Sequence, residues 1–136
     1  MATAKEFRVT IEDKPGALGN CFQALAERGV NILAFQSYVE ERESLVRFIA
    51  DDPATAKTVL GSLRMNFEET DAAVVGLPHR PGELGRAASR LGEKKVNIDY
   101  SYGGLEPGQG RPILVFGVDN VTVASKALDE LAAEVK

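Results

Sequence analysis

The chain of 136 residues is short of the residue types that most catalytic and metal sites require. It has one cysteine, Cys21, and one histidine, His79, so neither an internal disulfide nor a His/Cys metal cluster can form within it. A single cysteine, and the lack of an apolar signal segment behind Lys5, favour a cytoplasmic location. We therefore expect no metal and no cofactor.

Long apolar runs and an excess of positive charge are also missing. The longest apolar run with strand character, Ile113–Val118, is far too short to span a bilayer. The formal net charge of -4 argues against partners that are recognised by bulk electrostatics, so we expect neither nucleic acid nor membrane as a partner. What remains is an ordinary globular composition, with 44% hydrophobic and 26% charged residues.

The sequence contains two copies of one unit. Pro15-Gly16 recurs as Pro81-Gly82, 66 residues further on, and nine of the twenty positions from 13 to 32 are identical at this offset. Average composition would give about one or two such identities by chance. We therefore expect two domains, residues 1–70 and 71–136, which join near Glu68 to Asp71.

In the first copy, hydrophobic periodicity predicts the order strand, helix, strand, strand, helix, strand. Apolar residues alternate from Phe7 to Ile11, which is typical of a half-buried strand, and those from Leu18 to Leu25 have helical spacing. The helix is expected to end near Gly29. The other expected elements are strands at 32–39 and 45–50, a helix from Pro53 and a short strand around Phe67.

The second copy repeats this pattern up to its last helix. The expected elements are strands over 73–77, 97–102 and 113–118 and helices over 83–91 and 121–135. No fourth strand follows, so the second domain lacks one or a neighbour covers the edge that is left open. The glycine-rich stretch 103–110 lies between two strands, which indicates a flexible hairpin and not a phosphate-binding loop.

The order of strand, Pro-Gly turn, helix and Val-Asn-Ile resembles the ACT domain family, and it occurs twice. The first copy has Asp13-Lys-Pro-Gly16 with Gly29-Val-Asn-Ile32, and the second has His79-Arg-Pro-Gly82 with Lys95-Val-Asn-Ile98. The resemblance covers essentially the whole chain, and the arrangement is similar to stand-alone tandem ACT proteins with no attached enzyme. It implies an α+β fold of two ferredoxin-like βαββαβ modules, each an antiparallel sheet with two helices on one face. It also implies a role in sensing small molecules, most often amino acids.

The Pro-Gly turn and the helix after it are a candidate site for a free amino acid or a similar small zwitterion. We expect unpaired N–H groups of Gly16, Ala17 and Leu18 to bind a carboxylate. Asp13 is expected to bind the ammonium group and Asn31 to orient the ligand, because the turn and the start of the second strand are expected to lie close together. The full set of candidate ligand-binding residues is Asp13, Gly16, Ala17, Leu18, Asn31, Ile32, His79, Gly82, Glu83, Leu84, Asn97 and Ile98.

These residues also have purely structural interpretations. The Asp13 side chain can satisfy the turn or the helix start, which would block an anion there. Asn31 and Asn97 can be present only because asparagine tolerates an unusual backbone angle after the helix. In the second copy His79 replaces Asp13, so we expect that site to lack the anion and to bind differently or not at all.

A non-catalytic amino-acid sensor is the function that the sequence favours. His79 has no nucleophile motif nearby, so no catalytic residues are expected. The main alternative is an adaptor or repressor of amino-acid metabolism that acts through a regulated enzyme or a transcription factor. RRM-like nucleic-acid binding shares the βαββαβ order, but the third strands carry one aromatic residue each and no basic setting.

The strand pattern predicts a homodimer. Ile32 and Ala34 are expected on one face of the second strand and Leu33 and Phe35 on the other, so both faces are apolar. The stretch 113–118 is apolar on both faces as well. A second copy of the chain would bury the face that carries no helices, and coverage of the two modules by each other is the competing explanation.

Overall fold

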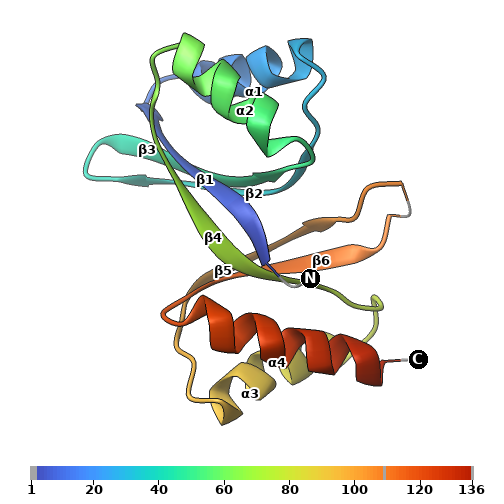
Figure 1. Cartoon of the computed structure of the whole chain (residues 1–136). Coiled ribbons are helices and arrows are strands. Elements are labelled where there is room, and N and C mark those ends of the chain that lie inside the picture. Colours follow the sequence, from blue (N-terminus) through green and yellow to red (C-terminus); the bar gives the residue numbers. More distant parts are fainter. Residues whose placement is uncertain (1–2, 109, 136) are drawn as a thin grey trace. The chain divides into compact units, whose positions relative to one another are not determined.

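The computed structural model describes residues 3–108 and 110–135. The described chain falls into two compact units, one of residues 5–70 and one of residues 71–135 together with Thr3 and Ala4. We call them the first and the second module. Each consists of antiparallel strands with two helices packed on one face (Figure 1). The α+β fold and the ferredoxin-like order predicted from the sequence are confirmed.

The first module is built around its third strand. Its elements are β1 (Thr3–Glu12), α1 (Ala17–Glu27), β2 (Ile32–Glu40), β3 (Glu43–Ala50), α2 (Pro53–Ser62) and the beginning of β4 (Asn66–Gly76). β3 pairs antiparallel with both β1 and β2. β4 lies beside β1, where the Phe67 ring is 6.1 Å from that of Phe7 and Glu68 forms an ion pair with Arg8 at 3.8 Å.

The second module has the same order after β4. Its elements are α3 (Glu83–Glu93), β5 (Ile98–Leu105), β6 (Pro112–Val118) and α4 (Val121–Glu134). β6 pairs antiparallel with β4 on one side and β5 on the other. The hairpin expected over 103–110 is present, although Gln109 lies outside the described residues. The Glu106 N–H donates to the carbonyl of Arg111 at 2.7 Å where the hairpin closes.

Each module has its own hydrophobic core between the sheet and the helices. In the first module the alternating residues Phe7, Val9 and Ile11 are buried, as their spacing predicts. They pack with residues of α1, β3 and α2, which include Cys21, Leu25, Val46, Phe48, Val59 and Leu60. The core of the second module contains Val75, Leu77, Ala87, Leu91, Phe116, Leu128 and Leu131.

β4 is one continuous strand of eleven residues and serves both modules. The short strand expected around Phe67 and the strand expected over 73–77 are therefore parts of the same element. Residues 66–70 belong to the first module and 71–76 to the second, so no linker separates the repeats. At the other end, Thr3 belongs to the second module, where its hydroxyl is 2.6 Å from that of Ser125 in α4.

A β-bulge near the start of the second strand of each module changes which side chains share a face of the sheet. In β2 the pairing with β3 shifts between Ile32 and Ala34, and in β5 the pairing with β6 shifts between Ile98 and Tyr100. The extra residue reverses the alternation, so Ile32 and Phe35 both face the helices. The Phe35 ring lies edge-on to Phe22 of α1 at 5.5 Å. The expectation that Ile32 and Phe35 lie on opposite faces was wrong, and the homodimer stays a prediction.

Candidate functional site

The turn between β1 and α1 is tightly folded around Gly16. The Lys14 N–H donates to the carbonyl of Glu12 at 3.0 Å, and the Ala17 N–H donates to the carbonyl of Lys14 at 3.3 Å. Gly16 then precedes α1 with a φ of 87°, a left-handed conformation that costs little only for glycine. The second module repeats this geometry, with a φ of 93° at Gly82.

The amides of this turn are only partly free to bind a carboxylate. The Ala17 N–H, and the equivalent Glu83 N–H, already donate within the turn, at 3.3 and 3.4 Å. This leaves the Gly16 and Leu18 amides as the candidate donors in the first module. Asp13 is exposed, and among the described residues no hydrogen bond or ion pair engages its carboxylate. The interpretation of Asp13 as a cap of the helix start was therefore wrong.

A hollow of about 390 Å³ opens beside the turn of the first module. Its polar rim includes Glu12 and Lys14, whose side chains form an ion pair at 2.9 Å. The hydrogen bond and the charge of Lys14 lower the pKa of Glu12, and Glu12 in turn raises the pKa of Lys14. The rest of the wall comes from β1, α1, the end of α2 and the start of β4, namely Thr10, Ile11, Ala17, Asn20, Cys21, Ala24, Leu63, Arg64, Met65 and Asn66.

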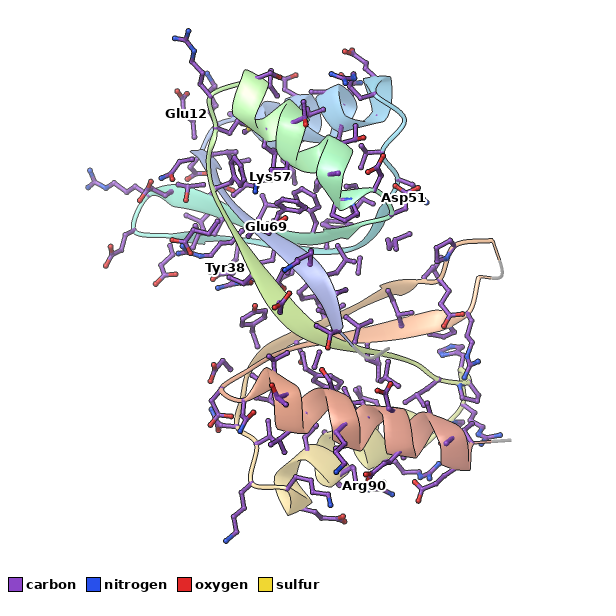
Figure 2. All side chains as sticks on the ribbon, viewed as in Figure 1. Glu12, Tyr38, Asp51, Lys57, Glu69 and Arg90 are labelled. Atoms are coloured by element: carbon purple, nitrogen blue, oxygen red, sulfur yellow. The ribbon has the colours of Figure 1, made fainter. Side chains whose placement is uncertain are left out.

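Asn31 lies at the opposite end of the first module from this turn. Glu12, at the end of β1, pairs with the first residue of β3, whereas Ile32, at the start of β2, pairs with the last. The eight residues of β3 separate them, which corresponds to about 25 Å. Figure 2 shows Glu12 and Asp51, the neighbour of Asn31, far apart. The expectation that Asp13 and Asn31 lie close together in one module was wrong.

Asn31 instead joins the start of β2 to the end of β3. Its N–H donates to the Asp51 carboxylate at 2.8 Å, and its carbonyl accepts from the Asp51 N–H at 3.0 Å. Asn97 makes the same pair of bonds with Asp119, at 3.0 and 3.3 Å. Its side-chain amide also donates to Asp99 at 2.8 Å. The two asparagines therefore fix the start of the second strand in both modules.

The left-handed backbone positions after α1 and α3 precede these asparagines by two residues. Gly29 has a φ of 78°, and Lys95, at the equivalent position, has a φ of 61°. The N–H groups of the next residues, Val30 and Val96, donate back to the helices at 3.1 and 3.0 Å. This is the arrangement that commonly ends a helix. The interpretation of Asn31 and Asn97 as residues that tolerate an unusual angle was wrong.

Sequence reasoning missed the aspartates and caps that follow the third strand of each module. Asp51 and Asp119 receive the asparagine amides, and the next residues, Asp52 and Asn120, cap the following helices. The Asp52 carboxylate accepts from the Thr55 N–H at 3.1 Å, and Asn120 accepts from the Val123 N–H at 3.1 Å. The signal was present, but these residues recur 68 positions apart because the second hairpin is longer.

The two caps differ in charge, which predicts a difference in pH dependence. Hydrogen bonds from the Thr55 hydroxyl and N–H lower the pKa of Asp52 below its ordinary value of 3.8. The stabilisation by Asp52 is therefore complete above pH 3.8 and is lost as the pH falls through the lowered pKa. At pH 7, Asp52→Ala and Asn120→Ala are each expected to lower Tm by about 3 °C. Thermal melts that extend from pH 7 to well below pH 3.8 should show the Asp52 effect shrinking while the Asn120 effect stays constant, and a parallel decline would contradict this.

The turn of the second module brings four of the candidate residues around another hollow. His79, Gly82, Glu83 and Leu84 line this space of about 380 Å³, with Leu77, Pro78, Arg80, Pro81, Pro112 and Leu114. Asn97 and Ile98 do not line it, because they lie at the other end of β5 from its hairpin. His79 stands where the first module has Asp13, and Glu83 places a carboxylate next to the same turn.

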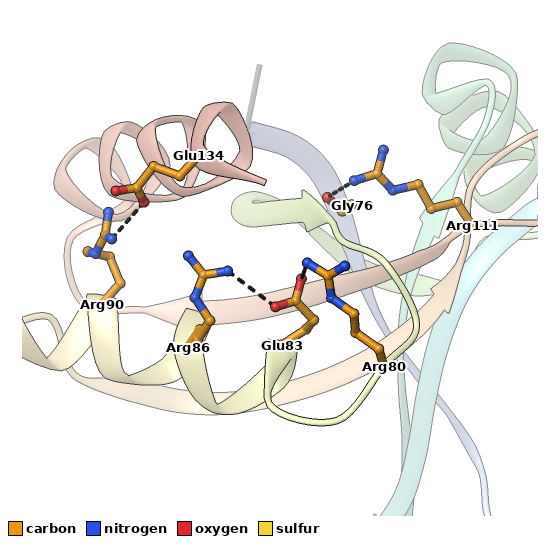
Figure 3. Close-up of polar contacts among 7 residues, drawn as sticks. All are labelled: Gly76, Arg80, Glu83, Arg86, Arg90, Arg111 and Glu134. Carbon is orange, nitrogen blue, oxygen red and sulfur yellow. Dashed lines mark hydrogen bonds and ion pairs between the residues drawn. The ribbon is translucent and has the colours of Figure 1, made fainter. Parts of the chain in front are cut away.

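Glu83 is a buried acid between two bases. Its side chain is 7% exposed, and its two oxygens form ion pairs with Arg80 at 3.4 Å and Arg86 at 3.2 Å (Figure 3). The Oε1 atom accepts a hydrogen bond from Arg86, whereas the buried Oε2 atom has no hydrogen-bond donor among the described residues. The acid also lies in the first turn of α3, where the helix dipole favours negative charge.

The described residues hold no group of three or more His, Cys, Asp or Glu side chains placed to bind a metal ion. Cys21 is buried, and burial raises the pKa of its thiol, so it is poorly suited to act as a nucleophile. No helix in the described part of the chain is long and apolar enough to cross a membrane.

The fold agrees with comparisons to known proteins. Residues 5–64 match the model of the ACT domain family. A crystal structure of a Bacteroides thetaiotaomicron protein is similar with a TM-score of 0.82 and 24% identity, over 96% of this chain and 89% of that one. The ligand-free regulatory subunit of aspartate kinase from Thermus thermophilus has a TM-score of 0.60 and 20% identity, over 95% and 91%. The equivalent subunit from Thermus flavus has a TM-score of 0.54 and 18% identity, over 98% and 94%.

A comparison with curated proteins found no match. The family match nevertheless spans nearly all of residues 5–70, the first module. The first module therefore matches the ACT domain family over nearly its whole length. The second module has the same fold.

Proposed function

We propose that the protein is a non-catalytic regulatory protein made of two ACT modules, residues 1–70 and 71–136, that bind a free amino acid. The observation that supports this most directly is the ACT match over residues 5–64, together with a hollow beside the Pro-Gly turn of the matched module. ACT domains are regulatory modules, and two of the structurally similar proteins are regulatory subunits of aspartate kinase. We place the protein in the cytoplasm on the composition of its sequence.

In the first module, the site that we propose joins the turn to the rim of the hollow. The Gly16 and Leu18 amides, at the positive end of α1, suit the carboxylate of an amino acid. Asp13, which has no partner among the described residues, and Glu12 both suit the ammonium group. The hollow of about 390 Å³ is near the lower end of the roughly 300–1,000 Å³ typical of ligand pockets, so it suits one small molecule.

Binding of an amino acid is expected to raise the thermal stability of the purified chain. A ligand at one hundred times its Kd adds about 2.7 kcal/mol to the free energy of unfolding, which is a shift of several degrees in Tm. A thermal-shift screen against the twenty amino acids, followed by calorimetry, measures this. If none of the twenty shifts the melt, the proposal is wrong.

Two variants locate the site. Asp13→Ala is expected to weaken binding, measured by calorimetry, by about tenfold, because it removes a charged partner of the ammonium group. Within one module Asn31→Ala should leave the affinity unchanged, because about 25 Å of β3 separates Asn31 from the turn. If both variants weaken binding, the ligand site is not confined to the turn and its hollow, and light scattering then tests whether a homodimer forms. Unchanged affinity in both would place the ligand elsewhere.

An adaptor role is the second candidate, in which the protein acts by contacting a regulated enzyme or a transcription factor. The observation that favours it is exposed apolar surface on β2, where Phe35 is 52% and Val39 is 58% exposed. Surface of this kind suits contact with another protein. The two candidates are compatible, since a bound amino acid can set the affinity for a protein partner.

A further inference from the structure

The second module contains a candidate ligand-binding site at the start of α3. The Glu83 side chain is only 7% exposed, and it lines the hollow beside the turn. Its Oε2 atom is buried without a hydrogen-bond donor among the described residues, which is a costly state for a carboxylate oxygen. Glu83 therefore brings a carboxylate with one unused acceptor to the lining of a space large enough for a small molecule.

The charges around Glu83 favour a zwitterion over a simple cation. Arg80, Arg86 and the start of α3 together outweigh the single negative charge of Glu83. A ligand with only an ammonium group would displace Arg80 from Glu83 and leave the guanidinium without an acid. A zwitterion placed between them gives its ammonium to Glu83 and its carboxylate to Arg80, so every charge stays paired.

Arg80 can make this exchange because it is loosely held. Its guanidinium is 3.4 Å from Glu83 Oε2 without the alignment of a hydrogen bond, and its side chain is 50% exposed. A small rotation about its side-chain bonds moves the guanidinium toward solvent and uncovers Oε2. Arg86, which donates to Oε1 at 3.2 Å, holds the carboxylate in place meanwhile.

The walls of the hollow determine the class of side chain. Apart from His79, Arg80 and Glu83, the lining is made of proline, glycine and leucine residues. Leu84, which is 58% exposed, lies at the start of α3. Leu77 directly follows β4, and Leu114 lies in β6. A hydrophobic ligand side chain would cover these leucines, whereas a charged one would lose its hydration without gaining a partner.

We propose that this hollow binds a free α-amino acid with an apolar side chain, whose ammonium group contacts Glu83 and whose carboxylate contacts Arg80. This rests on the proposed function and specifies its second site. The volume of about 380 Å³ is at the lower end of the range for ligand pockets and suits a single amino acid. The second module thus replaces Asp13 of the first by an acid four residues further along the repeat.

Calorimetry on the full chain, with L-valine, L-leucine, L-isoleucine, L-methionine and L-phenylalanine as probes, tests the proposal. For the tightest binder, Glu83→Gln is expected to weaken the affinity about 30-fold, because it removes the charge that pairs with the ammonium group. Glu93→Gln is the matched control, the same substitution in the same helix at an exposed ion pair away from this hollow. It should change the affinity less than threefold. If Glu83→Gln does not fold, Glu83→Asp, which retains the charge but withdraws it by one methylene, should weaken binding about tenfold.

Two further measurements separate the possible failures. Analogues of the tightest probe that lack either the carboxylate or the amino group should each bind at least about tenfold more weakly, because each leaves one charge unpaired. Amide chemical shifts should move at Leu84 when the probe is added. If shifts occur only between residues 10 and 24, or if Glu83→Gln binds like the wild type, this proposal is wrong while the proposed function stands. If none of the twenty amino acids binds, both are wrong.

Discussion

Replacing Phe48 by alanine is expected to lower the free energy of unfolding by about 4 kcal/mol. Phe48 is fully buried in β3, where it pairs with Phe7 and Phe35 of the flanking strands. Its ring stacks on that of Phe7 with 5.3 Å between the centroids, and Phe22 of α1 approaches edge-on at 6.0 Å. Truncation therefore removes a large buried area and leaves a cavity that neighbouring rings cannot fill without losing their own contacts.

Phe35→Ala is the matched control in the same module. It removes the same side chain, but from a position that is 52% exposed and touches the core mainly through Phe22. Its expected cost is about 1 kcal/mol, because less than half of the ring is buried. Urea unfolding followed by far-ultraviolet circular dichroism measures both. Equal losses for the two variants would show that the aromatic cluster does not depend on burial in the way that the structure indicates.

The repeated elements were predictable because they follow from local patterns. Alternation in Phe7, Val9 and Ile11 and helical spacing in α1 each need only the period of one element. The Pro-Gly turns were predictable too, since the left-handed conformation of Gly16 and Gly82 is one that glycine adopts with little strain. These features depend on neighbours in the sequence, and a duplicated signal made each of them more certain.

The separation of Asp13 from Asn31 could have been derived from topology alone. β1 and β2 both pair antiparallel with β3, so they run in the same direction. The end of one and the start of the other must then lie at opposite ends of the sheet. The bulge near Leu33, by contrast, leaves little trace in the sequence, because an inserted residue is defined only by the strand that it pairs with.

The burial of Glu83 was also beyond sequence reasoning. An acid in the first turn of a helix is ordinary, and its usual interpretation is an exposed residue that complements the helix dipole. Glu83 was a candidate ligand-binding residue from its place after the turn, but its burial between Arg80 and Arg86 beside a hollow follows only from the packing of the folded chain. The sequence shows that His79 stands at the position of Asp13, but not that the carboxylate of Glu83 is buried beside the same turn.

A cross-strand pair in the second module is the other place where a single substitution is expected to lower stability strongly. Tyr100 of β5 pairs with Gly117 of β6, and the equivalent pair in the first module is Ala34 with Ile49. The large residue lies on the second strand in the second module and on the third strand in the first. Each pair nevertheless has one large and one small residue. The Tyr100 ring lies directly over Gly117, so a Cβ atom there would overlap the ring. Gly117 is therefore required by its neighbour, although its own backbone angles are ordinary.

Gly117→Ala is expected to lower the free energy of unfolding by about 3 kcal/mol, because the Tyr100 ring must leave its position and its contact with Tyr102 at 6.4 Å. Gly92→Ala in α3 is the control with the opposite sign. No atom lies within 4 Å of a Cβ atom added there, so alanine should stabilise the chain by roughly 0.5–1 kcal/mol through its helix propensity. Urea unfolding measures both variants. If Gly117→Ala proves neutral, the ring of Tyr100 can turn aside at no cost, and the exchange of large and small residues between the modules would have no energetic basis.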